Sequence, residues 1–224
     1  MDNIANFITE LSKYFITLMP QVLDGLIETL KLFIVTLVLS LPLGIIVAIG
    51  RLSKNKIINK ITNLYITIMR GTPLLLQIVF VFFGLPLLGI VFDRFTAAII
   101  AFTLNYAAYF GEIFRAGIAS IDEGQYEGAE VLGLSKKDIF FRIILPQALK
   151  RVIPPVGNEV ITLVKDTALV YIIGIDELLK VGKNAVNRDA NLMPLIVIGI
   201  VYIILTWTLS KIMNNIENKY SYYR

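Results

Sequence analysis

The sequence predicts an all-α integral membrane protein with five transmembrane helices, an external N-terminus, a surface amphipathic N-terminal helix and a structured cytoplasmic loop. Hydrophobic residues make up 56% of the chain and charged residues 17%, whereas soluble proteins carry roughly 25% charged residues. The apolar residues also occur in blocks long enough to cross a bilayer, which takes about 20 residues per helix. Both observations favour a polytopic membrane protein.

Residues 1–20 precede the first apolar block and are expected to form an amphipathic helix at the membrane surface. Their apolar residues recur at helical spacing: Ile4, Phe7, Ile8, Leu11, Phe15 and Leu18. Such a stripe is typical of a helix that lies in the membrane interface. A frayed polar terminus is the alternative. We do not expect a signal peptide, because a basic start and a small-residue cleavage site are both missing.

Five apolar blocks are the expected spans of a transmembrane region over residues 21–215, which a cytoplasmic tail (216–224) follows. The blocks cover approximately residues 22–49, 61–83, 95–114, 148–173 and 193–212. The fourth block is the weakest, because prolines and charged residues interrupt it. Spans tolerate such residues only where they face protein or a water-filled cavity.

The distribution of lysine and arginine predicts the orientation. The connections after the first and third blocks are the most basic, with Arg51, Lys54, Lys56 and Lys60, and with Arg115, Lys136, Lys137 and Arg142. The connection after the second block offers only Arg94, and acids offset the basic residues after the fourth. Because basic residues accumulate on the cytoplasmic side, the N-terminus is expected outside and the C-terminus in the cytoplasm.

The largest cytoplasmic loop contains the densest cluster of charge, EGAEVLGLSKKDIFFRIILP (127–146). Gly133 is a natural helix stop, and Ser135 can cap a second helix with Asp138 three residues later. Pro146 then restarts the chain into the fourth span. One face of the first helix is expected to carry an apolar ridge of Tyr126, Ala129 and Leu132. These signals predict two short helices that form a docking element, or else an ordinary solvated loop.

This segment resembles the EAA loop of type I ABC-importer permeases. The pattern of that loop is E-A-A, three residues, G, nine residues, I, one residue, L-P. The chain places at those spacings Glu127, Gly128, Ala129, Gly133, Ile143, Leu145 and Pro146. The one departure is Gly128, which lowers helix propensity. The resemblance implies that loop 122–146 inserts into a groove of a separate ATPase through Glu127, Ala129, Gly133, Leu134 and Lys136.

The resemblance extends over residues 20–215. In this range the sequence is similar to the polar amino-acid uptake branch of these permeases, the histidine, glutamine and arginine type. It rests on MRGTPLLLQ (69–77), AAYFGEIFRAGI (107–118), DEGQYEGAEVLGLS (122–135) and LPQALKRVIPPVGNEVITLVKDTALV (145–170). Ala168 departs from the serine common in that branch. The resemblance implies a prokaryotic inner-membrane complex of two permease subunits, expected as a homodimer, with two ATPases and an extracytoplasmic solute-binding protein.

Several functions are excluded by what the sequence lacks. It has no histidine and no cysteine, which removes thiol chemistry, disulfides and the usual metal ligands. It also has no G-x-x-x-x-G-K-[ST] phosphate loop, so ATP and Mg are expected on the partner ATPase and no cofactor, metal or catalytic residue on this chain. Its basic residues lie between apolar blocks, which indicates a membrane lipid environment rather than nucleic acid.

Polar residues inside the spans predict the substrate site, because an intramembrane charge costs about 2.5–3.5 kcal/mol. Arg70 lies beside Gly71 and Pro73, which are expected to interrupt the second span. It is expected to bind a substrate carboxylate, or else to form a structural ion pair with an acid on another helix. The full set of candidate substrate-binding residues is Arg70, Thr72, Asn105, Tyr109, Glu112, Asp166 and Thr167.

Asn105, Tyr109 and Glu112 form one polar stripe on the third span, because they are four and three residues apart. Glu112 can receive an ammonium group while Tyr109 packs on the ligand, or the stripe can join helices within the bundle. Asn105 by itself favours the structural role. On the fourth span, Asp166 and Thr167 are expected to line the pathway.

A zwitterionic substrate needs one cation and one anion, and the spare acid favours a basic amino acid such as arginine, lysine or histidine. Glutamine, glutamate and cystine are the alternatives within the same class. Two rivals come from other classes: an ion-coupled amino-acid carrier, and an intramembrane enzyme that would use Glu112 and Asp166 as a carboxylate pair. The first would not need a rigid docking loop, and the absence of histidine and cysteine disfavours the second.

Overall fold

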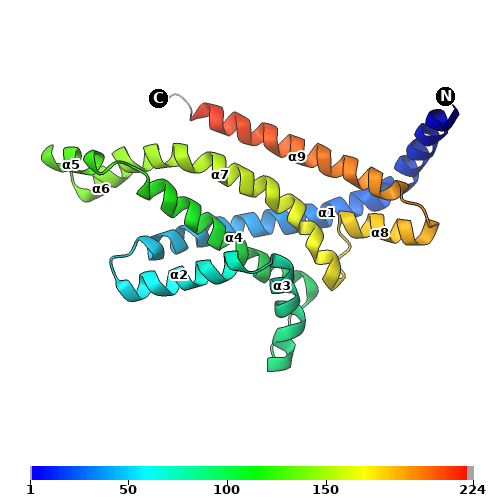
Figure 1. Cartoon of the computed structure of the whole chain (residues 1–224), viewed down its shortest axis with the longest axis horizontal. Helices are drawn as coiled ribbons and strands as arrows, with labels where there is room; N and C mark the ends of the chain where they lie inside the picture. The colour runs from blue at the N-terminus through cyan, green and yellow to red at the C-terminus, as the bar shows by residue number, and fades with distance from the viewer. Residues whose placement is uncertain (1, 221–224) are drawn as a thin grey trace. The chain divides into compact units, whose positions relative to one another are not determined.

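The computed structural model describes residues 2–220, and all regular structure in that range is helical (Figure 1). The α-helices are α1 (Asp2–Leu52), α2 (Lys56–Gly71), α3 (Leu74–Val79), α4 (Arg94–Ala119), α5 (Glu123–Val131), α6 (Lys136–Asp138), α7 (Leu145–Asp166), α8 (Leu178–Asp189) and α9 (Met193–Lys219). Between them lie the π-helical segments η1 (Phe80–Gly84) and η3 (Ile139–Ile144), and the 3-10 helices η2 (Leu85–Leu88) and η4 (Thr167–Ile173). The all-helical prediction is confirmed.

The predicted surface helix and the first span are one continuous helix. α1 contains 51 residues, which at about 1.5 Å per residue extend roughly 77 Å, far beyond a hydrocarbon core of about 30 Å. The side chains of Ile4, Phe7 and Ile8, which belong to the predicted apolar stripe, lie outside the described residues. The interfacial position of residues 1–20 stays a prediction.

Three helices of the described chain are long and apolar enough to cross a membrane: α1 over Thr9–Leu52, α4 and α9. The pair formed by α2 and the segment Leu74–Leu88 meets the same criterion together, although the two parts are bent by 102° at the break between them. α7 does not meet it, and it contains Pro154 and Pro155. Up to four of the five predicted spans are therefore found by length and composition.

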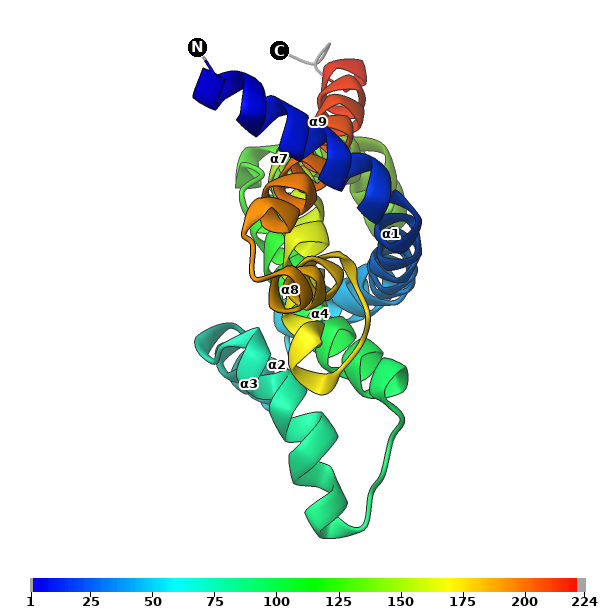
Figure 2. The same ribbon diagram turned by 90° about the vertical axis from the view of Figure 1, so that its right-hand side faces the viewer.

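The chain divides into two compact units. The first contains residues 1–36, 74–101 and 162–208, and the second contains residues 37–73, 102–161 and 209–224. In the first unit, α1 packs against α8 and α9 (Figure 2) through Leu18, Val22, Leu178, Val181, Ala185 and Ile198. Gly25 permits the close approach of α1 and α8, because an added Cβ would lie 2.9 Å from Cγ2 of Val181 and 3.2 Å from the backbone nitrogen of Leu178.

A buried carboxylate begins α8 in this first unit. Glu177 is fully buried, and its side chain accepts hydrogen bonds from the backbone N–H groups of Leu179 and Lys180, each at 2.7 Å. The Tyr202 hydroxyl of α9 donates a third bond at 3.1 Å, and the Leu178 N–H donates to the Thr29 hydroxyl of α1 at 3.3 Å. These contacts join the start of α8 to both neighbouring helices.

In the second unit, small residues allow α1 and α4 to cross closely. A Cβ added to Gly44 would lie 2.7 Å from Cβ of Phe110, and one added to Gly111 would overlap the Val47 side chain. Small residues at such crossings are typical of helix packing in membranes, where van der Waals contact replaces the hydrophobic effect. This crossing fixes the segment of α4 that carries the predicted polar stripe.

Candidate substrate site and coupling loop

The predicted interruption of the second span lies between α2 and α3. α2 ends at Gly71, and Thr72 adopts an extended conformation (φ −119°, ψ 144°). A residue before proline prefers this conformation, and Pro73 follows. The interruption predicted from Gly71 and Pro73 is therefore confirmed, and it ends the backbone hydrogen bonding of α2, so that side chains can bond the last carbonyl groups of the helix.

Two side chains bond those terminal carbonyl groups. The Thr72 hydroxyl donates to the Ile68 carbonyl at 2.8 Å, and the Asn105 amide donates to the Met69 carbonyl at 2.9 Å. Through this bond the amide of Asn105, a residue that is only 4% exposed, links α4 to the end of α2. This bond is compatible with the structural role that the sequence favours for Asn105, and both that role and substrate binding by Asn105 stay predictions.

Arg70 and Tyr109 face each other at this helix end. The guanidinium carbon of Arg70 lies 5.1 Å from the centroid of the Tyr109 ring, a distance typical of a cation–π contact. Arg70 is exposed and lies in the last turn of α2, where a cation interacts favourably with the helix dipole. It forms no ion pair with an acid among the described side chains, so the alternative of a structural ion pair lacks support here.

Glu112 is occupied by a neighbouring arginine. Nη2 of Arg115 lies 2.5 Å from one carboxylate oxygen and Nε of Arg115 lies 2.9 Å from the other, which is a bidentate pair. Both side chains are about a quarter exposed, at 25% and 27%. Arg51 and Arg70 also act electrostatically on this carboxylate. An ammonium group that binds Glu112 must therefore compete with a guanidinium.

Asp166 and Thr167 belong to the first unit, whereas the other five candidate residues belong to the second. α7 ends at Asp166, and Thr167 begins the 3-10 helix η4. Thr167 is fully buried and its hydroxyl donates to the Val164 carbonyl at 2.8 Å. Asp166 is partly exposed and Lys165 is exposed, consistent with the turn of about 100° between neighbouring helical residues.

The coupling loop has the capping geometry that its sequence predicts. Gly133 has φ +73°, and the Leu134 N–H donates to the Ala129 carbonyl at 3.2 Å, as in a Schellman helix end. The Ser135 hydroxyl oxygen accepts from the Asp138 N–H at 3.1 Å and caps the next helix. The helix stop at Gly133 and the cap at Ser135 are both confirmed.

Two expectations for this loop are wrong. Ala129 belongs to a buried cluster with Ile121, Ile139, Ile144 and Ala148, and Tyr126 packs against this cluster. Leu132, by contrast, is 78% exposed, and the neighbouring Val131 is 88% exposed. α5 ends at Val131, so Leu132 no longer follows the periodicity of the helix. The second helix is also not separate, because α6 continues through η3 into α7. Pro146 is the second residue of α7, in a first turn that tolerates proline.

The predicted coupling residues accordingly divide into two groups. Glu127, Gly133 and Lys136 are exposed. Ala129 is buried and Leu134 packs on the same cluster. Leu132 was predicted as part of the apolar ridge, whereas the exposed Val131 beside it was missed, although two adjacent apolar residues in a charged loop are a visible signal.

Comparisons with known proteins agree with this architecture. Residues 40–222 match the family model described as binding-protein-dependent transport system inner membrane component. The chain is 41% identical over 202 residues to the arginine transport system permease protein ArtQ of Bacillus subtilis (strain 168), with 89% of this chain and 92% of ArtQ covered. It is 37% identical over 212 residues to the putative glutamine transport system permease protein GlnP of Rickettsia typhi, with 92% and 97% covered.

A solved structure shows the same fold. It is titled "Crystal structure of an amino acid ABC transporter with histidines", and it superposes with a TM-score of 0.86 at 34% identity, covering 91% of this chain and 96% of the other. Members of this family are permease subunits of the bacterial inner membrane, and the ATPase is a separate subunit. The chain belongs to the family of binding-protein-dependent transport system inner membrane components, as a permease subunit of an amino-acid ABC importer.

Proposed function

We propose that this chain translocates polar amino acids into the cell and that basic amino acids are its preferred cargo. The observation that carries the proposal is the exposed Arg70 guanidinium over the Tyr109 ring, at the break between α2 and α3. The broken helix, the Arg70 cation, which has no ion-pair partner among the described residues, and the nearby carboxylate of Glu112 form the kind of site that transporters use for zwitterions. The chain's similarity to an arginine permease supports the preference.

In this proposal, Arg70 binds the substrate carboxylate and Tyr109 packs on the substrate. Glu112 exchanges its bond to Arg115 for one to the basic side chain of the substrate. Thr72 and Asn105 hold the end of α2 in place, and Asp166 and Thr167 line the pathway. The substrate must bind the two states of the transporter with different affinity, since otherwise it could not couple to the conformational change.

The mechanism further requires five spans with the N-terminus outside, of which α7 is the fourth along the chain. Two copies of the chain, two ATPases and an extracytoplasmic solute-binding protein form the complex, and ATP and Mg bind to the ATPases. ATP binding closes the ATPases, which move the loop through Glu127, Gly133, Lys136 and the exposed Leu132. The continuous helical path from α6 to α7 supports this step, because it connects the loop directly to a span.

A glutamine permease is the second candidate, and the chain's similarity to GlnP favours it. The uncharged amide of glutamine needs no free carboxylate, so it would leave the pair of Glu112 and Arg115 intact. The two candidates therefore differ in whether Glu112 touches the cargo.

The test is ATP-dependent uptake of labelled amino acids into proteoliposomes that contain the permease, its ATPase and the solute-binding protein. We expect saturable uptake of arginine, lysine or histidine, and loss of that uptake in Arg70→Gln. Lys31→Gln is the control, because Lys31 is 56% exposed, pairs with Glu28 on α1 and lies outside the candidate site and the coupling loop. Uptake of glutamine alone would favour the second candidate, and uptake of no amino acid would contradict both.

A further inference from the structure

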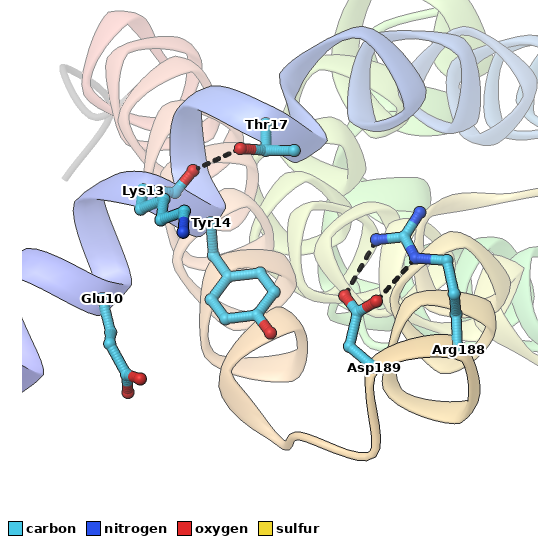
Figure 3. A pocket seen from close by; sticks show the side chains of 6 residues that line it. All are labelled: Glu10, Lys13, Tyr14, Thr17, Arg188 and Asp189. Carbon is cyan, nitrogen blue, oxygen red and sulfur yellow. Dashed lines mark hydrogen bonds and ion pairs between the residues drawn. The ribbon is translucent and has the colours of Figure 1, made fainter.

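A polar cavity of about 320 Å³ lies in the first unit, between the N-terminal part of α1 and the C-terminal end of α8 (Figure 3). Its volume is at the lower end of the range of about 300–1,000 Å³ for small-molecule sites. The residues that line it are Glu10, Lys13, Tyr14, Thr17, Arg188 and Asp189. None of them belongs to the candidate substrate site or the coupling loop.

The charges of this cavity balance. Lys13 and Arg188 are cations, and Glu10 and Asp189 are anions. Arg188 and Asp189 satisfy each other through two bonds of 2.7 and 2.8 Å, and their hydrogen bonds lower the pKa of Asp189 and raise that of Arg188. The ammonium of Lys13 and the carboxylate of Glu10 have no side-chain partner among the described residues. The cavity thus presents one unpaired charge of each sign.

An aromatic side chain lies between the two sides of the cavity. Tyr14 extends from α1 toward the Arg188–Asp189 pair in Figure 3, and its hydroxyl acts electrostatically on Arg188. The Thr17 hydroxyl is directed to the Lys13 carbonyl at 2.8 Å, so it contributes little to a ligand. Tyr14 can therefore donate a hydrogen bond to an anionic group that reaches Lys13.

The position of the cavity along the helices favours a location at the membrane surface. Asp189 lies four residues before the start of α9, an apolar helix long enough to span the bilayer. Leu18 of α1 packs with Ile198 of α9, about one turn inside that start. Ile16, which precedes the lining residue Thr17, is 74% exposed, and Leu192, three residues after Asp189, is 68% exposed. Apolar side chains exposed beside a charged cavity at a helix end are typical of the headgroup level.

We propose that this cavity binds the headgroup of a zwitterionic phospholipid, with the phosphate at Lys13 and Tyr14 and the ammonium at Glu10. A phosphoethanolamine group supplies an anion and a cation separated by a short chain, which matches the two unpaired charges. The bilayer supplies this ligand next to the exposed Ile16 and Leu192, on which its acyl chains can pack. With the N-terminus outside, as proposed above, the lipid belongs to the outer leaflet.

The same chemistry is available from two other sources, inorganic phosphate and a free amino acid. Neither would use the exposed apolar residues beside the cavity. A lipid also differs from both in that it stays with the protein during purification, whereas soluble ions are removed. The proposal concerns lipid binding and is independent of which amino acid the importer carries.

The test is native mass spectrometry of the purified permease–ATPase complex after incubation with phosphatidylethanolamine, phosphatidylglycerol, inorganic phosphate or arginine. We expect phosphatidylethanolamine to bind to each permease copy, and Lys13→Gln and Glu10→Gln to weaken it by about fivefold each, since exposed charge pairs contribute about 1 kcal/mol or less. Lys13→Arg should retain binding. Lys31→Gln is the matched control, because Lys31 lies on the same helix and pairs with Glu28 outside the cavity.

Several outcomes would overturn the proposal. Equal retention of phosphatidylethanolamine by the wild type and Lys13→Gln would show that the lipid binds elsewhere. Displacement of the lipid by arginine or phosphate would assign the cavity to a soluble ligand. Unchanged lipid binding with weaker association of the solute-binding protein in Lys13→Gln would assign it to protein docking. Gel filtration of each variant complex verifies that it is assembled.

Discussion

At the scale of single residues, the charges of the third span are paired more fully than their sequence spacing suggests. Arg115 lies three residues after Glu112, on the same face of α4, and holds the carboxylate in a bidentate contact. An isolated carboxylate inside a span would be costly, and this pair neutralises the charge of Glu112 while no substrate is bound. At Glu112, a basic substrate would then replace the guanidinium of Arg115 by its own guanidinium or ammonium group.

This exchange predicts the effect of Arg115→Gln. Removing the internal competitor should lower the KM for arginine uptake by about fivefold, because a partly exposed ion pair is worth about 1 kcal/mol. The KM for glutamine uptake should change much less. The measurement is uptake of both amino acids by proteoliposomes, with Glu112→Gln as a second variant. An equal change for arginine and glutamine would contradict the exchange.

Glu177 predicts a pH dependence of stability. Burial raises the pKa of this carboxyl above its ordinary value of 4.5, although hydrogen bonds from Leu179, Lys180 and Tyr202 oppose the shift. Because the folded pKa is the higher one, the stabilisation is present below pH 4.5 and is lost as the pH rises through the folded pKa. Glu177→Gln lacks this titration.

Thermal unfolding of the purified complex at a series of pH values tests this prediction. The difference in Tm between the wild type and Glu177→Gln should shift against the wild type as the pH rises from about 4.5 toward neutrality. Glu217→Gln, a change at an exposed position of α9, should show no such trend. A constant difference between the wild type and Glu177→Gln over this range would rule out the raised pKa.

At the scale of elements, the coupling loop shows what local sequence signals can and cannot predict. The break at Pro73, the stop at Gly133 and the cap at Ser135 are confirmed, because backbone preferences of one to four residues determine them. The inward packing of Tyr126 was missed because it depends on Ile144 at the end of η3 and Ala148 at the start of α7, which belong to the cluster on which Tyr126 packs. Likewise, the bond from Asn105 to Met69 spans 36 residues.

Gly128 provides a test of local helix stability within α5. An added Cβ would meet no atom within 4 Å, and alanine restricts the unfolded chain more than glycine. Gly128→Ala should therefore stabilise the loop by about 0.4–1 kcal/mol, which slower amide hydrogen exchange over residues 123–131 would reveal. Faster exchange in the variant would show that α5 requires the glycine.

The exposed end of α5 predicts an effect on ATPase coupling. Leu132 and Val131 project from the loop, and burying one such side chain in a groove contributes about 1.5–3 kcal/mol. Leu132→Ser should weaken association of the ATPase and lower substrate-stimulated ATP hydrolysis, while the permease itself stays folded. Co-purification of the ATPase with each variant measures the first effect. Full co-purification with unchanged hydrolysis would contradict a coupling role for Leu132.

At the scale of the whole molecule, composition alone predicts a multi-pass helical protein, and the structure and the comparisons confirm it. The number of spans is harder to predict from the sequence than the helical class. α7 combines two prolines with charged residues, and α2 forms one bent pair with the segment Leu74–Leu88. Both features come from residues that interrupt apolar helices. They coincide with the segments that carry Arg70, which we propose to bind the substrate, and Asp166, which we propose to line its pathway.

In the proposed mechanism, the membrane-spanning subunit itself binds the amino acid at Arg70 and Glu112. The most direct test is equilibrium binding of labelled amino acids to the purified permease–ATPase complex without the solute-binding protein. We predict saturable binding of basic amino acids, lost in Arg70→Gln and weakened in Glu112→Gln, with Lys31→Gln unchanged. Absence of binding to a folded complex would contradict the claim, because these charges would then be structural and the solute-binding protein alone would select the cargo.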